Sequence, residues 1–218
     1  SPGTVIVTAV GEVSNVRKTV KPVVSKDQET ELLYVNFSKD NFQLGGSSLA
    51  QVLDKIGNNT PDVNDTAYFK NCFNTIQKLI EEGLILAGHD VSAGGLITTL
   101  LEMTFANCEG GLNIDLSAFN NNDLVSVAFS EQPAVVIQIN DAKAKEILAN
   151  NNIDFVVIGK PQDKREITLT KDNETYNLDI NALRDVWYKS SYMLDKKQSG
   201  EDKATQRFDN YKKQDLRY

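Results

Sequence analysis

The chain has 218 residues, 40% of them hydrophobic, and a formal net charge of −7 at pH 7. An acidic chain of this length allows one sizeable core, or one domain with an appendage, and is unsuited to nucleic acid, whose phosphates favour basic surfaces. It contains no apolar stretch of about 18 residues and no N-terminal basic region followed by an apolar core, so we expect neither a membrane span nor secretion, and a cytoplasmic location.

Short apolar or alternating runs predict β-strands along most of the chain, the clearest being residues 134–139, Ala-Val-Val-Ile-Gln-Ile. The predicted strands are 5–9, 31–37, 84–87, 112–115, 125–129, 134–139, 155–159, 167–170 and 176–180. The last two flank the turn residues 171–174 and predict a hairpin. Strands mixed with helices in this way favour an α+β fold with a mixed sheet over a uniformly parallel one.

Apolar residues at helical spacing predict helices between the strands. The strongest covers residues 66–82, with Asp65 as its N-cap and Gly83 just past its end. Further helices are expected over 48–56, with capping-box spacing between Ser48 and Gln51, over 96–106, and over 142–150 behind Asp141.

The C-terminal residues 184–218 differ in composition from residues 1–183, which we take as the main domain. They carry nine Lys and Arg against six Asp and Glu, whereas the rest of the chain is acidic. Within them, residues 196–218 are charged and weakly apolar, which predicts a helix that needs a partner, or partial disorder.

The two cysteines, Cys72 and Cys108, fall on a predicted helix face and at a helix end. We therefore expect two free thiols in a reducing compartment. One histidine and two cysteines without ligand-like spacing do not predict a zinc site.

Residues 87–96, Ala-Gly-His-Asp-Val-Ser-Ala-Gly-Gly-Leu, are expected to form a polar loop between a strand and a helix. A glycine-rich turn that enters a helix aims backbone N–H groups and the positive end of the helix dipole at one spot, which suits an anion. The structural alternative is that His89 and Asp90 order the loop while Gly94 and Gly95 allow close helix packing. For this motif alone the two interpretations are evenly balanced.

A second loop of the same kind spans residues 44–51, Leu-Gly-Gly-Ser-Ser-Leu-Ala-Gln. Taken alone, it favours an ordinary capped helix. Two helix starts of this design in one domain make phosphate binding the better hypothesis, with Gly45, Gly46 and Ser47 as the candidate cradle.

Together these loops resemble the phosphoribosylformylglycinamidine synthase family. The resemblance also rests on residues 100–106, Leu-Leu-Glu-Met-Thr-Phe-Ala, on Gly110-Gly111-Leu112, and on residues 2–9, 16–18 and 30–34. It covers residues 1 to about 195 and is strongest with the C-terminal domain of the second aminoimidazole-ribonucleotide-synthetase-like half of the large, single-chain form. The family implies a three-layer α/β/α arrangement, with residues 184–218 linking toward a glutaminase domain.

The resemblance implies a domain of the ATP- and glutamine-dependent ligase of purine biosynthesis that converts formylglycinamide ribonucleotide to its amidine. ATP activates the amide oxygen as a phosphorylated imidate and ammonia displaces phosphate, with Mg²⁺ to neutralise phosphate charge. The implied partners are the ribonucleotide substrate and two further parts of the polypeptide, the ATP-binding half and the glutaminase. No residue of this chain is assigned a catalytic role, and the chain alone is expected to be inactive.

The resemblance also implies roles for the residues of the 87–96 loop. Asp90 is the expected Mg²⁺ ligand, and Ser92, with Gly94 and Gly95, the expected contact to a nucleotide phosphate. His89 is expected to order the loop rather than to act as an acid or base. The family usually carries an acid where this chain has Ala93, which argues against tight metal binding. Glu102 is given no role by the resemblance, and from the residues alone we expect it to be solvated at the surface or to cap a helix.

Other interpretations stay open. The chain could be a non-catalytic interaction module whose acidic body docks a basic partner. It could also belong to another enzyme of the superfamily, such as a selenophosphate synthetase or a thiamine-monophosphate kinase. Within the synthase, the loop could serve the active or an auxiliary nucleotide site. The natural open reading frame would distinguish the synthase from the interaction module and from the other enzymes, because the synthase needs a glutaminase domain downstream of Tyr218.

Overall fold

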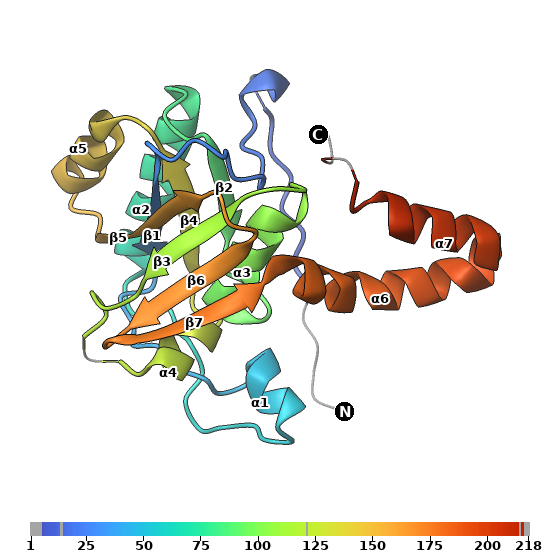
Figure 1. Cartoon of the computed structure of the whole chain (residues 1–218). Coiled ribbons are helices and arrows are strands. Elements are labelled where there is room, and N and C mark those ends of the chain that lie inside the picture. The colour runs from blue at the N-terminus through green and yellow to red at the C-terminus, as the bar shows by residue number, and fades with distance from the viewer. Residues whose placement is uncertain (1–5, 14, 121, 214, 216–218) are drawn as a thin grey trace.

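A seven-stranded mixed sheet runs through the chain in the order β2-β4-β1-β5-β3-β6-β7 (Figure 1). The computed structural model describes residues 6–13, 15–120, 122–213 and 215. The strands are β1 (Glu31–Asn36), β2 (Ala87–Asp90), β3 (Gly111–Asp115), β4 (Ala134–Ile139), β5 (Phe155–Gln162), β6 (Glu166–Lys171) and β7 (Glu174–Asp179). Neighbouring strands are antiparallel except β3 and β6, which are parallel.

Helices cover both faces of this sheet. They are α1 (Ser48–Val52), α2 (Thr66–Glu81), α3 (Gly95–Phe105), α4 (Leu124–Phe129), α5 (Ala142–Asn150), α6 (Ile180–Ser199) and α7 (Glu201–Asn210), preceded by the short 3₁₀ helix η1 (Val16–Lys18). Alternate residues of β1 enter different cores: Leu33 packs with α2 and α5, whereas Leu32 packs with α3 and α4. This confirms the α+β fold and its three layers.

Two expected helix starts and the hairpin are confirmed. The carboxylate of Asp65 accepts a hydrogen bond from the Tyr68 N–H, and that of Asp141 accepts one from the Lys143 N–H. Strands β6 and β7 form the hairpin, whose turn residues Asp172 and Asn173 both have positive φ. That conformation matches the right-handed twist of the flanking strands. Both cysteines are free thiols.

The strand expected over residues 84–87 lies three residues further on, at Ala87–Asp90. Gly83 adopts positive φ after α2, and the N–H of Leu84 then bonds back to the carbonyl of Leu79, so Leu84 closes the helix. Consequently His89 and Asp90 lie in edge strand β2, paired with β4, rather than in a loop.

Two other predicted strands are wrong. Residues 125–129 belong to helix α4, because Asp123 caps it by accepting from the Ser126 N–H and turns Val127 and Ala128 into the core. Residues 6–9 form no strand and are exposed, while Val5 lies outside the described residues.

Helix α1 begins behind Ser47, not Ser48, and ends at Val52 rather than near residue 56. Asp54 adopts positive φ and stops it.

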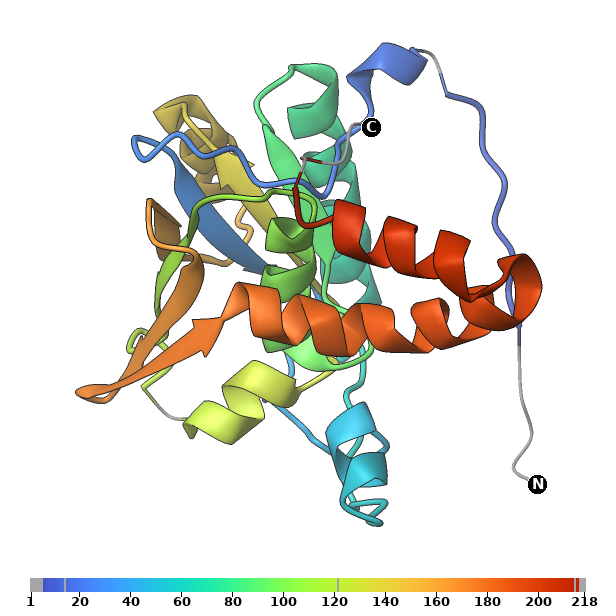
Figure 2. The same ribbon diagram turned by 45° about the vertical axis from the view of Figure 1, so that its right-hand side comes forward.

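The C-terminal region forms a helical hairpin that projects from the sheet (Figure 2). Helix α6 continues from Asp179, its N-cap, through the expected domain boundary at residues 183 and 184, and Gly200 separates it from α7. The helix expected over 196–218 is therefore two helices, and residues 214 and 216–218 lie outside the described part. Within that part, no helix is long and apolar enough to cross a bilayer.

Candidate functional site

In the first glycine loop, residues 44–51, backbone N–H groups already donate to carbonyl groups of the same segment. The N–H of Gly45 bonds to the carbonyl of Asn59, and the N–H of Gly46 to that of Ile56. Ser47 is buried, and its hydroxyl donates to the Leu44 carbonyl while accepting from the Ala50 N–H. A phosphate bound here would have to replace some of these bonds.

The second loop connects β2 to α3. Gly94, at positive φ, is the N-cap of α3, and the N–H of Gly95 bonds to the carbonyl of Ser92. A Cβ on Gly95 would lie 2.6 Å from the backbone carbonyl carbon of Phe129. Gly95 therefore lets α3 approach α4 closely.

One carboxylate that the motifs did not predict joins the two loops. Oε1 of Glu131 accepts from the N–H of Ser48 at 2.7 Å and from the N–H of Gly94 at 2.8 Å. Burial raises the pKa of Glu131, but the two N–H donors outweigh it, so this pKa lies below its ordinary value. Glu131 is far in sequence from both donors, so no local spacing could have revealed it.

His89 contacts two carboxylates, which fixes its ring within β2. Its Nδ1 lies 2.8 Å from the carbonyl oxygen of Asp90 and 3.4 Å from the Asp90 carboxylate, and its Nε2 lies 3.4 Å from Glu102. Glu102 also accepts a hydrogen bond from the indole N–H of Trp187. The expectation of a merely solvated Glu102 is therefore wrong, since it ties β2 to α6.

Two cavities adjoin the predicted site residues. One of about 500 Å³ lies beside α1 and is lined by Gly45, Leu49 and Asn59 among others. Another of about 220 Å³ lies between α3 and the C-terminal hairpin and is lined in part by His89, Glu102 and Trp187. The structure thus brings Ser48 and Gly94 together through Glu131, whereas Gly45 and His89 face different cavities.

The Asp90 side chain is 73% exposed. In the part of the chain that the structure describes, no three His, Cys, Asp or Glu side chains gather in a group able to hold a metal. A Mg²⁺ ion with one carboxylate from this chain would need its other ligands from phosphate, water or other domains, which is a common arrangement for this ion. The metal role of Asp90 stays a prediction.

Comparison with known families shows to which family the chain belongs. The model described as AIR synthase related protein, C-terminal domain, matches residues 32–172. The chain belongs to this family. The match covers all of the sheet except β7 and the first residue of β1, so both glycine loops and Glu131 lie inside the AIR synthase related domain.

Relatives of this AIR synthase related domain are much longer proteins. The chain is 37% identical over 203 residues to the probable phosphoribosylformylglycinamidine synthase, chloroplastic/mitochondrial, of Arabidopsis thaliana. This match covers 91% of the chain and 14% of the plant protein. Among solved structures, T. maritima PurL complexed with ATP has a TM-score of 0.59 at 14% identity, over 78% of the chain and 28% of PurL. The same protein complexed with FGAR gives a TM-score of 0.59 at 16% identity, over 78% of the chain and 30% of PurL. These structural likenesses concern the fold.

Proposed function

We propose that the chain is the C-terminal domain of the second synthetase-like half of a large phosphoribosylformylglycinamidine synthase. The observation that carries this proposal is the 37% identity to the plant synthase over 91% of the chain. The parent enzyme would convert formylglycinamide ribonucleotide to its amidine with ATP and glutamine. Its other partners would be the ATP-binding half and the glutaminase of the same polypeptide, and its location the cytoplasm, although the plant relative's name places that protein in organelles.

In this proposal the chain supplies binding and orientation, not the reacting groups. Ser92, Gly94 and Gly95 lie at the start of α3, where the helix dipole favours a phosphate of ATP or ADP. Gly45, Gly46 and Ser47 would hold a second phosphate beside the 500 Å³ cavity. The contacts of His89 with Asp90 and Glu102 support its ordering role.

Mg²⁺, when bound, would neutralise charge on the nucleotide phosphates. Asp90 fits as one ligand because its carboxylate is exposed at the end of β2, directly before the phosphate loop. Ala93 supplies no second carboxylate there, so the chain alone would hold the ion weakly.

We expect Asp90→Asn in the full-length enzyme to reduce its bound nucleotide and magnesium together, because the amide keeps an acceptor but loses the charge. Nucleotide and metal content per purified protein measure this, with circular dichroism as the check on folding. Asp54→Asn is the matched control, since Asp54 is an exposed aspartate after α1. Equal content in Asp90→Asn and wild type would contradict the metal role.

The isolated chain should produce no amidine from formylglycinamide ribonucleotide, ATP and ammonium, because the proposal places amide activation and ammonia delivery in other domains. The full-length protein, assayed in parallel, should produce it. Product that scales with the concentration of this chain, in material free of host enzyme, would contradict the division of labour. A full-length protein without amidine synthesis would overturn the proposed function itself.

A further inference from the structure

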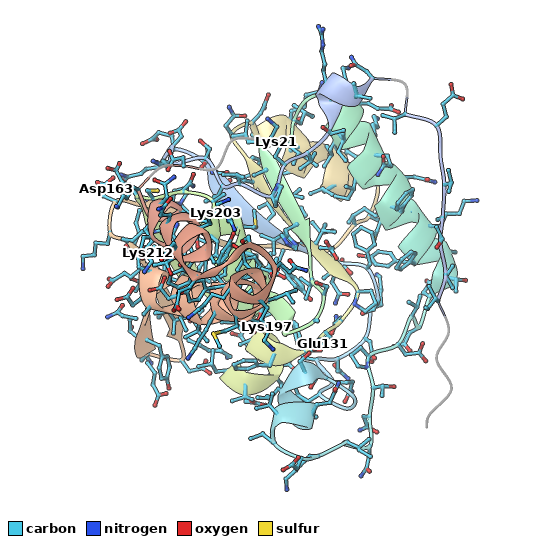
Figure 3. The ribbon with its side chains drawn as sticks, turned by 90° about the vertical axis from the view of Figure 1, so that its right-hand side faces the viewer. Lys21, Glu131, Asp163, Lys197, Lys203 and Lys212 are labelled. Carbon is cyan, nitrogen blue, oxygen red and sulfur yellow. The ribbon has the colours of Figure 1, made fainter. Side chains whose placement is uncertain are left out.

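The two glycine loops are linked to each other by a single side-chain atom. Oε1 of Glu131 accepts from the N–H of Ser48, the first residue of α1, and from the N–H of Gly94, the N-cap of α3. Figure 3 shows Glu131 beside the ribbon of α1. Glu131 itself follows α4, so three helices meet at one carboxylate.

The other bonds of these loops do not replace this link. Gly45 and Gly46 bond to Asn59 and Ile56 within the segment around α1, and Gly95 bonds to Ser92 within its own turn. Helix α1 lies apart from the sheet layers and contains no buried residue, and Val52 within it and Leu53 and Ile56 after it are exposed, so the core does little to fix it (Figure 1).

The two N–H donors favour the ionised form of the Glu131 carboxylate. A carboxylate that accepts two backbone N–H bonds at the start of a helix is stabilised in its ionised form. An ionised acceptor makes hydrogen bonds about twice as strong as a neutral one.

We propose that Glu131 is a positioning residue that fixes the spacing of the two glycine loops, so that ligand binding at one loop is coupled to ligand binding at the other. This inference rests on the proposed function, in which both loops contact phosphates. Glu131 would then be a positioning residue for the synthetase reaction that lies outside both glycine motifs.

Amide hydrogen exchange in the isolated chain tests the link without any ligand. In Glu131→Ala, the amides of Ser48 and Gly94 should both exchange at least about tenfold faster than in wild type, because they lose one shared acceptor. Glu131→Gln keeps one oxygen at the same reach and should restore most of the protection. Glu146→Gln, an exposed glutamate on α5, is the control and should change neither amide. Unchanged exchange of Ser48 and Gly94 in a folded Glu131→Ala would overturn the proposal.

A titration with Mg-ADP, and one with inorganic phosphate, tests the coupling by nitrogen-15 NMR. In wild type, resonances of residues 45–48 and 92–95 should shift together with one apparent Kd. In Glu131→Ala they should shift with Kd values that differ several-fold, and Glu131→Gln should bring them back together. A single shared Kd in Glu131→Ala would overturn the coupling. Absence of any shift in wild type would count against the proposed ligand loops, while the exchange result would still decide whether Glu131 links them.

Discussion

Substituting Gly95 by alanine should lower the free energy of unfolding by about 3 kcal/mol or more, through left-handed strain plus overpacking. Gly95 has a φ of +74°, and a Cβ there would lie 2.6 Å and 2.7 Å from backbone atoms of Phe129. Backbone atoms in a packed helix cannot move aside as the end of a flexible side chain can. Relief therefore requires α3 and α4 to separate, which opens the core between them.

Gly83→Ala provides a matched control for this substitution. Gly83 has a similar φ of +71°, but nothing lies within 4 Å of its added Cβ. The Gly83→Ala variant should lose only about 1 kcal/mol of its free energy of unfolding, which is the strain of the backbone conformation. Urea unfolding followed by circular dichroism compares the two variants. Equal losses would show that the close approach of α3 and α4 contributes nothing.

Arg184→Ala should destabilise the chain by about 3 kcal/mol, because it removes a buried charged donor from two carbonyl groups. Arg184 is 2% exposed, and its guanidinium donates to the carbonyl oxygens of Phe105 and Asn107, at the end of α3. It also lies over the ring of Tyr211, 4.6 Å from its centroid. One side chain thus joins α3, α6 and the segment after α7.

The loss of Arg184 should loosen the C-terminal hairpin before the sheet. Trp187, the chain's only tryptophan, lies one turn further along α6, so its fluorescence reports on the hairpin. In Arg184→Ala this signal should change at lower urea than circular dichroism does, whereas in wild type the two should coincide. Arg207→Ala is the control, because Arg207 is half-exposed and pairs with Asp195 on the surface, so it should cost less than about 1 kcal/mol. Coincident transitions in Arg184→Ala would contradict this role.

The sequence predicts an element well where a local pattern determines it. Helix α2 has both a cap at Asp65 and an uninterrupted apolar stripe, and β4 is apolar at every position but Gln138, so both are predicted almost to the residue. Residues 125–129 alternate like a strand, and only the bond between Asp123 and Ser126 identifies a helical turn. The strand β2 is displaced because Leu84 completes the end of α2 instead of starting a strand.

In the candidate site too, local motifs predict some features, whereas contacts between distant residues are missed. The glycine loops and the family follow from motifs, whereas the motifs place His89 and Asp90 in a loop and the structure places them in strand β2. The bridge through Glu131 and the contact between Glu102 and Trp187 join residues far apart in the sequence. Such pairs arise only from the tertiary fold, and neither amphipathic spacing nor capping patterns contain them.

The strand order has a consequence for how the chain is synthesised. Among the strands of the described residues, only β6 and β7 are neighbours both in the sheet and in the sequence. Strand β1 pairs with β4 and β5, so during translation its apolar residues Leu32 to Val35 have no sheet partner until residues 134–139 have left the ribosome. Pairing across such separations requires closing long loops and is slow. Nascent chains that stall before β4 should therefore expose an unpaired apolar strand and depend on chaperones to avoid aggregation.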